Sequence, residues 1–311
     1  MIKKVFFYID DVIWIFRDLT RKNPKSIFDN PFLTVMKKAH DEYGLKVQLN
    51  VFYRTDFYYG NDEFTLADMT DSYKSEWKNN SDWLKFSFHA KQEFPDYPYI
   101  NADYRDVKEG YESFANEVKR FASNENIAKT VVPHWTVISK DGARALFDCG
   151  VKLLSLTSGG EKKEYSGNSS DLPYGHAGRL LQNKKPETMV YIRPTKDTAI
   201  SSAICGYNYV SQNMAESMSG TFKTISDAET GITFKQLCNT SALNLNTLDE
   251  VESLFKPVLG KEYIGTMIHE QYFYNDYFAY QPDFDKKIYT MAKILHDNGY
   301  EFFFAEELVK N

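Results

Sequence analysis

The chain has 311 residues, of which 42% are hydrophobic, and its formal net charge is −6. This length suits one large α/β barrel or two smaller domains. The negative charge argues against nucleic acid as a main partner, because phosphate binding requires a basic face. No apolar run approaches the roughly 20 residues needed to span a membrane. The amino terminus has no separate apolar signal segment, so we expect a cytoplasmic protein.

Strands and helices are predicted to alternate over the first half of the chain. A strand at 5–9 is followed by a loop and by a helix at 31–43, which has Pro31 at its first position and Gly44 after its end. The same patterns predict a strand at 46–53, a helix at 72–80, a strand at 83–88, a helix at 104–123, a strand at 130–133, a helix at 140–148 and a strand at 151–156. This alternation indicates a largely parallel sheet.

The region 158–246 interrupts the alternation. It is rich in glycine and serine, and only a strand at 189–192 and a helix at 209–217 are predicted within it. We interpret it as an insertion or as extended loops over the barrel mouth, not as a separate domain. Four of its side chains are expected to approach the site, namely Tyr165, Tyr174, His176 and Arg179.

The regular pattern resumes after the insertion. A helix at 247–255, a strand at 263–268, a helix at 285–297 and a strand at 300–304 complete the chain. We therefore expect a single domain over 1–311, with an α/β fold of the distorted (β/α) barrel type.

Four of the predicted strands end directly in acidic or imidazole side chains. Asp10-Asp11 follow the apolar run 4–9, His89 follows 83–88, His134 follows 130–133, and His269-Glu270 follow 263–268. An α/β barrel places its chemistry at the carboxyl ends of its strands, so these side chains should converge at one mouth. The two aspartates and three imidazoles meeting there are typical of a hydrolase with a single metal ion.

Neighbouring residues of this set are expected to have different roles. Side chains alternate along a strand, so one of Asp10 and Asp11 can bind a metal while the other faces the attacking water. Glu93 lies four residues after His89 and either reaches the same metal or forms a hydrogen bond within its loop. Glu270 is expected to orient His269 or a neighbouring group.

The aromatic content points to a carbohydrate ligand. Phe, Tyr and Trp make up 16% of the chain, and clusters such as Tyr272-Phe273-Tyr274 fall in predicted loops. Aromatic faces with a polar group suit sugars, which offer both apolar and hydrogen-bonding surface. The alternative is that these rings pack beneath long loops.

The order of these strand-end motifs resembles that of the polysaccharide deacetylase family, the carbohydrate esterases with NodB homology. Phe7-Tyr8-Ile9-Asp10-Asp11 resembles its first motif, Phe88-His89-Ala90 its second, Val132-Pro133-His134-Trp135 its third and Ile268-His269-Glu270 its late motif. The resemblance implies a TIM-like, seven-stranded barrel. It also implies that Asp10 is the general base, that Asp11 and His89 bind metal, and that His269 is the general acid.

The chain departs from the family pattern in three places. The second motif usually carries two histidines four residues apart, and here the second position is Glu93. No Arg precedes Pro133, and no Gly follows Asp11. We expect His134 to supply the missing imidazole, so that Asp11, His89 and His134 hold one divalent metal. Glu93 is the alternative ligand if His134 does not reach the metal. Such ligands suit Zn²⁺.

The sequence therefore predicts a metal-dependent enzyme that removes N- or O-acetyl groups from a carbohydrate. Two alternatives remain open at this point. One is a non-catalytic carbohydrate-binding protein on the same fold. The other is a metal-free glycoside hydrolase that uses Asp10 or Asp11 together with Glu270 as its pair of carboxyl groups.

Overall fold

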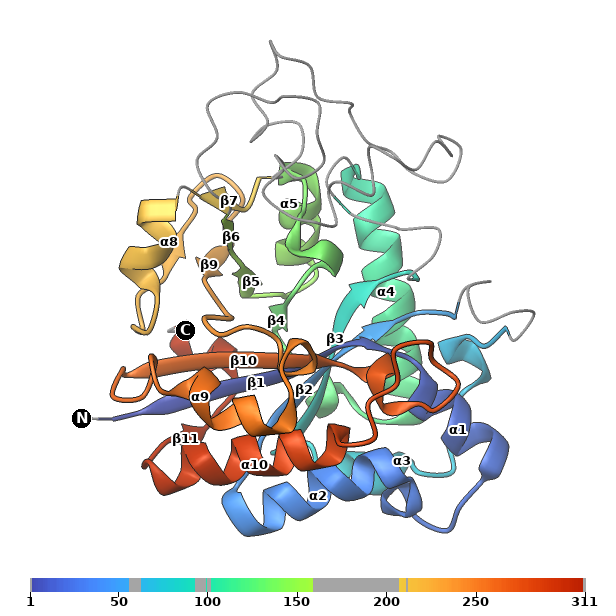
Figure 1. Cartoon of the computed structure of the whole chain (residues 1–311). Helices are drawn as coiled ribbons and strands as arrows, with labels where there is room; N and C mark the ends of the chain where they lie inside the picture. The colour runs from blue at the N-terminus through green and yellow to red at the C-terminus, as the bar shows by residue number, and fades with distance from the viewer. Residues whose placement is uncertain are drawn as a thin grey trace.

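Parallel strands surrounded by helices form the centre of the molecule (Figure 1). The structure is a computed structural model that describes residues 2–55, 63–92, 99, 102–158, 207–210 and 212–309. The strands of this part of the chain belong to two main sheets and one short pair. Both main sheets contribute strand ends to the candidate site.

The first sheet contains four long parallel strands and one short one. Their order is β10 (Tyr263–His269), β1 (Lys4–Val12), β2 (Val47–Phe52) and β3 (Leu84–Ala90), and β11 (Glu301–Phe302) pairs with the start of β1. The residues of β2 are buried without interruption. Both faces of a parallel strand in an α/β fold are covered, and within β2 the apolar residues alternate with the polar residues Gln48 and Asn50.

The second sheet contains shorter strands. Its order is β4 (Thr130–Val131), β5 (Leu153–Ser155), β9 (Thr233–Lys235) and β8 (Ile225–Ser226), with only β8 antiparallel to its neighbour. A separate parallel pair joins β6 (Thr157–Ser158) to β7 (Tyr209–Val210). Both β8 and β9 lie inside the segment 158–246 that was expected to be an insertion. The segment therefore supplies two strands of the second sheet, and strands of two and three residues are too short to give a strand pattern in the sequence.

Contacts at two places join the two sheets in the manner of a distorted α/β barrel. On one side Phe86 of β3 forms a parallel bridge with Ile127, just before β4. On the other side the Asn239 N–H donates to the Gly265 carbonyl of β10 at 3.0 Å. A Cβ at Gly265 would lie 1.6 Å from the Leu237 carbonyl oxygen, so only glycine allows this approach.

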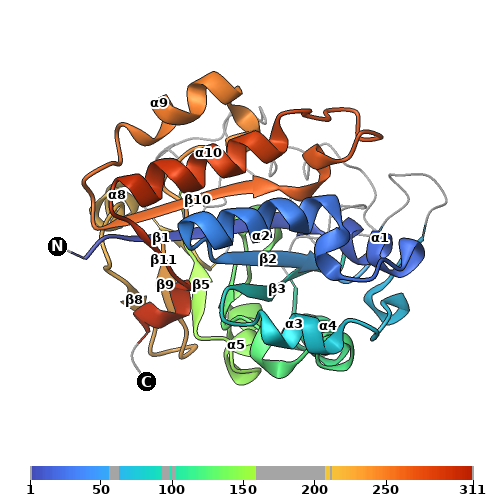
Figure 2. The same cartoon turned by 90° about the horizontal axis from the view of Figure 1, so that it is seen from below.

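Helices cover the outside of the strands. In Figure 2, α2 (Pro31–Tyr43) and α10 (Phe284–Asp297) lie side by side across the first sheet, with α9 (Val251–Phe255) beyond them. The remaining α-helices of the described residues are α1 (Trp14–Lys22), α3 (Lys74–Asn79), α4 (Tyr104–Phe121), α5 (Lys140–Asp148) and α8 (Gln212–Met218). None of the described helices has the length and apolar character required to cross a bilayer.

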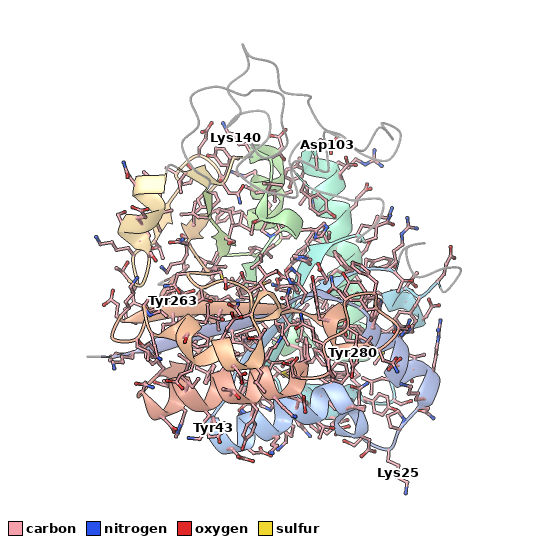
Figure 3. The ribbon with its side chains drawn as sticks, viewed as in Figure 1. Lys25, Tyr43, Asp103, Lys140, Tyr263 and Tyr280 are labelled. Atoms are coloured by element: carbon pink, nitrogen blue, oxygen red, sulfur yellow. The ribbon has the colours of Figure 1, made fainter. Side chains whose placement is uncertain are left out.

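Capping residues define several helix ends as the sequence predicts. The Asn30 side chain accepts hydrogen bonds from the Phe32 and Leu33 N–H groups at the start of α2, and Gly44 ends that helix with φ 68°. Asp103, labelled in Figure 3, caps α4 by accepting from the Asp106 N–H at 2.8 Å. The Ser139 hydroxyl accepts from the Gly142 N–H at 2.9 Å at the start of α5. The predicted bounds of α2 and α5 are confirmed to the residue.

Two helix predictions are corrected. Residues 14–22 were expected to form a loop but form α1, which begins at the end of β1 with no side-chain cap at Ile13. The helix predicted at 209–217 begins only at Gln212, because Tyr209 and Val210 form β7. The strand predicted at 189–192 lies outside the described residues.

Candidate metal centre

Three side chains from three strand ends converge on one point. The Asp11 Oδ1 atom lies 3.2 Å from His89 Nε2 and 3.7 Å from His134 Nδ1, and those two nitrogens are 3.3 Å apart. Asp11 belongs to β1 and His89 to β3, and His134 begins a short 3₁₀ helix after β4, η5 (His134–Thr136). The two histidines are 2% exposed, so the ligand atoms face one another inside the barrel mouth.

The spacing of the three atoms fits a metal ion. The point equidistant from Asp11 Oδ1, His89 Nε2 and His134 Nδ1 lies about 2 Å from each, and zinc binds imidazole nitrogen and carboxylate oxygen at roughly 2.0–2.2 Å. The set contains one anionic and two neutral ligands, which is a chemistry that first-row divalent ions accept. These three residues can therefore hold a metal ion.

The backbone of Asp11 is distorted in the way this convergence requires. Its φ is 62°, in the left-handed region that non-glycine residues rarely occupy, and the pairing of β1 with β2 shifts register between Ile9 and Val12. Thr136, at the end of η5, has φ 57°. Two of the three described non-glycine residues with positive φ thus lie at or beside this site, and such conformations concentrate at functional sites.

The orientation of His89 is set by a main-chain contact. Its Nδ1 lies 2.7 Å from the Val132 carbonyl oxygen, so in the neutral ring Nδ1–H donates and Nε2 carries the lone pair directed at the cluster. Metal-binding histidines are commonly held in this way. Burial by itself would lower the pKa of His89, but the charges of Asp10 and Asp11 raise it. The imidazole is thus surrounded by negative charge even before any cation binds.

The carboxylate of Asp11 is oriented by a residue of the last strand end. The Gln271 Nε2 donates to Asp11 Oδ2 at 2.8 Å, which leaves Oδ1 facing His89 and His134. Burial opposes ionisation of Asp11. When the His89 ring is protonated, however, its Nε2–H donates to Asp11, and this hydrogen bond and the nearby charges of His269 and His134 together lower the pKa of Asp11 below the usual range. Asp11 is therefore a carboxylate, as a metal ligand must be.

Asp10 lies beside this cluster without entering it. Its Oδ1 accepts a hydrogen bond from Asn50 Nδ2 at 2.6 Å and lies 3.9 Å from His89 Nδ1. The Asn50 amide is fixed in turn by Gln48, whose Nε2 donates to Asn50 Oδ1 at 2.7 Å. Burial raises the pKa of Asp10, and the charges of His89 and His269 oppose that rise. A buried carboxyl group of raised basicity next to a metal site suits proton transfer.

His269 approaches from the last strand of the first sheet. Its Nε2 lies 3.9 Å from Asp11 Oδ2, and its side chain is 25% exposed. The opposite nitrogen, Nδ1, lies 3.0 Å from the Asn244 Oδ1 atom. In the neutral ring this contact places the proton on Nδ1 and leaves Nε2 to exchange a proton with a substrate.

The expected role of Glu270 is corrected. Both of its carboxylate oxygens accept hydrogen bonds from the start of α1, namely from the N–H groups of Ile13, Trp14 and Ile15 at 2.6, 2.9 and 2.8 Å. Glu270 is fully buried, and burial raises its pKa to about 7. It therefore caps a helix, and Asn244 rather than Glu270 orients His269.

Other predicted residues lie outside the described part of the chain or away from the site. Glu93 and the four residues expected to line a lid, Tyr165, Tyr174, His176 and Arg179, are outside the described residues. Tyr274 packs against Trp14 with ring centroids 4.7 Å apart and is 9% exposed, so the alternative of packing beneath a loop holds for this ring.

The side chains that orient the site residues were not predicted from the sequence. Asn50, Gln271 and Asn244 orient Asp10, Asp11 and His269 respectively. One signal was present for Asn50, because it lies near the end of the predicted strand at 46–53, where the other strands carry their functional groups. Asn244 lies in a 3₁₀ segment, η8 (Leu243–Leu245), that no sequence pattern distinguishes.

Comparison with known proteins gives information about the fold. No family model matches the chain, and no curated protein matches its sequence. The chain is similar to the crystal structure of 4-α-glucanotransferase from Thermococcus litoralis, with a TM-score of 0.53 and 10% identity over 99% of this chain. It spans 40% of the length of that enzyme. At this identity the likeness shows a shared fold and says nothing about activity.

Two carbohydrate esterase structures are more distant. A family 4 acetyl xylan esterase from Clostridium thermocellum, solved with a cobalt ion, aligns with a TM-score of 0.41 and 11% identity over 98% of this chain and 90% of its own. The Xyl-CE4 domain of a multidomain xylanase from the hindgut metagenome of Trinervitermes trinervoides aligns with a TM-score of 0.43 and 9% identity over 98% and 89%.

Proposed function

We propose that the protein is a metal-dependent hydrolase that removes acyl groups, N- or O-acetyl, from a carbohydrate. The observation that carries this proposal is the triangle of Asp11, His89 and His134, whose atoms are spaced for one ion. Asp10 and His269 stand next to that triangle, within 3.9 Å of His89 and Asp11 respectively. A ligand set with a separate base and a separate acid is what hydrolysis of an acyl bond requires.

The ligand residues would hold Zn²⁺, which when bound would polarise the acyl carbonyl and lower the pKa of a water toward about 7. Asp10 would accept the proton of the attacking water. Asn50 supports this role because its N–H fixes one oxygen of Asp10. In its cationic form His269 would give the proton on Nε2 to the leaving amine or alcohol, while Asn244 keeps its ring in place.

The carbohydrate part of the proposal rests on the order of the motifs. Asp-Asp, His, Pro-His and His-Glu follow successive strand ends in the order found in the polysaccharide deacetylases. Four of these residues (Asp10, Asp11, His89 and His269) lie on three strands of one sheet, β1, β3 and β10, and this placement supports common ancestry of the site more than any one short motif. A non-catalytic sugar-binding protein would keep the barrel but would not need both Asp10 and His269 next to the ligands.

The decisive experiment measures metal content and acetate release on the same preparations. Purified protein loaded with Zn²⁺ is assayed on a panel of N-acetylated and O-acetylated sugars, with a chelated sample as control. We expect about one ion per chain and acetate release that disappears on chelation and returns with metal. Stoichiometric metal with no acetate release from the whole panel would favour the non-catalytic alternative.

A further inference from the structure

One buried lysine takes no part in the chemistry proposed above. Lys287, on α10, is 3% exposed, whereas its neighbour Lys286 is exposed. Burying an ammonium group costs free energy unless polar atoms replace the lost water. The Lys287 Nζ donates to Gln281 Oε1 at 2.8 Å and lies 3.5 Å from Asp283 Oδ1. The contact with Gln281 leads from this lysine toward the candidate site.

The lysine fixes the orientation of the Gln281 amide. An ammonium group can only donate hydrogen bonds, so the amide has to present its oxygen to Lys287. The amide nitrogen then faces the other way, and Nε2 donates to the main-chain carbonyl of Asn244 at 2.7 Å. If the amide turned over, its N–H groups would face the ammonium and its oxygen would face a carbonyl, so both contacts would be repulsive. Lys287 therefore selects the orientation in which Gln281 binds Asn244.

Gln281 connects two segments that flank His269. Asn244 belongs to η8, and its side-chain Oδ1 lies 3.0 Å from His269 Nδ1. The main-chain N–H of Gln281 donates at 2.9 Å to the carbonyl of Tyr272, which lies in the loop that follows β10. One residue thus holds both the loop that follows His269 and the segment that carries Asn244.

Other contacts of η8 do not set the direction of the Asn244 side chain. Asn246 Nδ2 donates to Ser241 Oγ and to the Ala242 carbonyl, both at 2.8 Å. These bonds shape the turn from within and do not join it to β10. Leu243 is fully buried, but apolar burial is not directional. A hydrogen bond from a distant part of the chain can supply that direction.

We propose that Lys287 is a positioning residue for His269. It acts through the Gln281 amide and the Asn244 side chain. Its presence keeps Asn244 Oδ1 as the acceptor of the proton on His269 Nδ1, which leaves Nε2 directed at the mouth of the barrel. This inference rests on the proposed function for the catalytic meaning of His269, but the orientation of the ring can be tested without a substrate.

The test reads the protonation of the His269 ring directly. Long-range ¹H–¹⁵N NMR spectra of the zinc-loaded protein are recorded at about pH 8.5, where an imidazole is ordinarily neutral, and they report which ring nitrogen carries the proton. The signal missing from His269→Ala identifies the ring. We expect the proton on Nδ1 in the wild type and a mixture of both tautomers in Lys287→Met, with metal content unchanged. Lys286→Met, the same change at the exposed neighbour, should give the wild-type spectrum. Spectra of the chelated protein allow the same comparison if zinc is not retained.

Two further variants distinguish positioning from a general effect on stability. Gln281→Glu keeps an acceptor for Lys287 but cannot donate to the Asn244 carbonyl, so the tautomer of His269 should change although the buried lysine keeps its partner. In an Asn244→Ala background, Lys287→Met should have no further effect on the ring, because the connection is already broken.

Three results would overturn the positioning role. One is a wild-type His269 spectrum in Lys287→Met. The second, which decides the matter if Lys287→Met does not fold, is a wild-type spectrum in Gln281→Glu. The third is an equal effect of Lys287→Met with and without Asn244.

Turnover separates this role from the proposed function. Where acetate release is found, Lys287→Met should lower kcat about three- to tenfold, the size of one weakened hydrogen bond, and leave KM within about twofold. A kcat equal to that of the wild type would overturn the catalytic importance of the orientation. Acetate release that survives His269→Ala, with the tautomers as expected, would instead overturn the role of His269 as the acid and leave the positioning of its ring intact.

Discussion

The ends of β1 and β10 carry the same kind of motif but use it differently. The two strands are neighbours in register, with Asp10 opposite His269, and each ends in two consecutive titratable residues. At the end of β1 both Asp10 and Asp11 face His89, at 3.9 and 3.2 Å. At the end of β10 His269 faces the site, and Glu270 turns away to cap α1.

The difference lies in the backbone. Consecutive side chains of a regular strand point to opposite faces, and the end of β10 keeps this alternation. The end of β1 breaks it, because Asp11 has φ 62° and the pairing with β2 shifts register there. A pair of adjacent acidic residues therefore serves one site only where the strand is distorted, and the cost of that distortion points to function.

The largest effect is expected at Asp11, the residue on which the distortion centres. Asp11→Asn removes the only anionic ligand of the triangle, so we expect metal affinity to fall by more than about a hundredfold and activity to disappear. Metal content after dialysis, measured beside the circular dichroism spectrum, checks this result. Full retention of metal by the folded variant would show that Asp11 is not a ligand.

The second-largest effect is a loss of turnover at Asp10, which distinguishes the expected base from the neighbouring metal ligand Asp11. Asp10→Asn should keep the metal but lower turnover by about 10²–10⁴-fold, the usual contribution of a general base. The same metal analysis and the acetate-release assay are applied to both variants. If Asp10→Asn loses the metal while Asp11→Asn keeps it, the two aspartates have been assigned the wrong way round.

For the pair on β10 we expect a change in stability at Glu270. Glu270→Ala leaves the N–H groups of Ile13, Trp14 and Ile15 without their acceptor, so the free energy of unfolding should fall by roughly 2–4 kcal/mol at pH 5. Denaturant unfolding of wild type and variant measures this difference in the free energy of unfolding. The control is Glu252→Ala, an exposed glutamate of α9, which should cost less than about 0.5 kcal/mol.

A catalytic role for Glu270 would give the opposite pattern. In that case Glu270→Ala would keep the stability of the wild type and lose turnover. The capping role instead predicts that the folded fraction of the variant still binds metal at the wild-type ratio.

The smallest effect is expected in the pH dependence of the contribution that Glu270 makes to the free energy of unfolding. Burial raises the pKa of Glu270 from an ordinary 4.5 to about 7. Between these values the folded chain keeps a proton that the unfolded chain has released, so this contribution to stability is present at low pH and is lost as the pH rises to about 7. The stability advantage of the wild type over Glu270→Ala should therefore narrow from pH 4.5 to 7. An advantage that widens with pH would show that the helix N–H groups keep Glu270 ionised.

Much of the architecture could be predicted because its signals are local. Asn30, Pro31 and Gly44 mark both ends of α2, and the apolar runs before Asp10, His89 and His269 mark three strands of the first sheet. β9 could not be found, because three residues give no pattern. α1 was missed because its cap, Glu270, is 255 residues away from Ile15 in the chain.

The sequence by itself determined which side chains lie at the carboxyl edge of the sheet, because parallel strands place all their carboxyl ends on one side. Only the tertiary structure decided which atoms meet there. Asp11 enters the site through a bulge that depends on pairing with β2, and Gln271 and Asn244 orient their partners across 260 and 25 residues. Those contacts depend on loops from distant parts of the chain, and no local pattern encodes the direction in which such loops present a side chain.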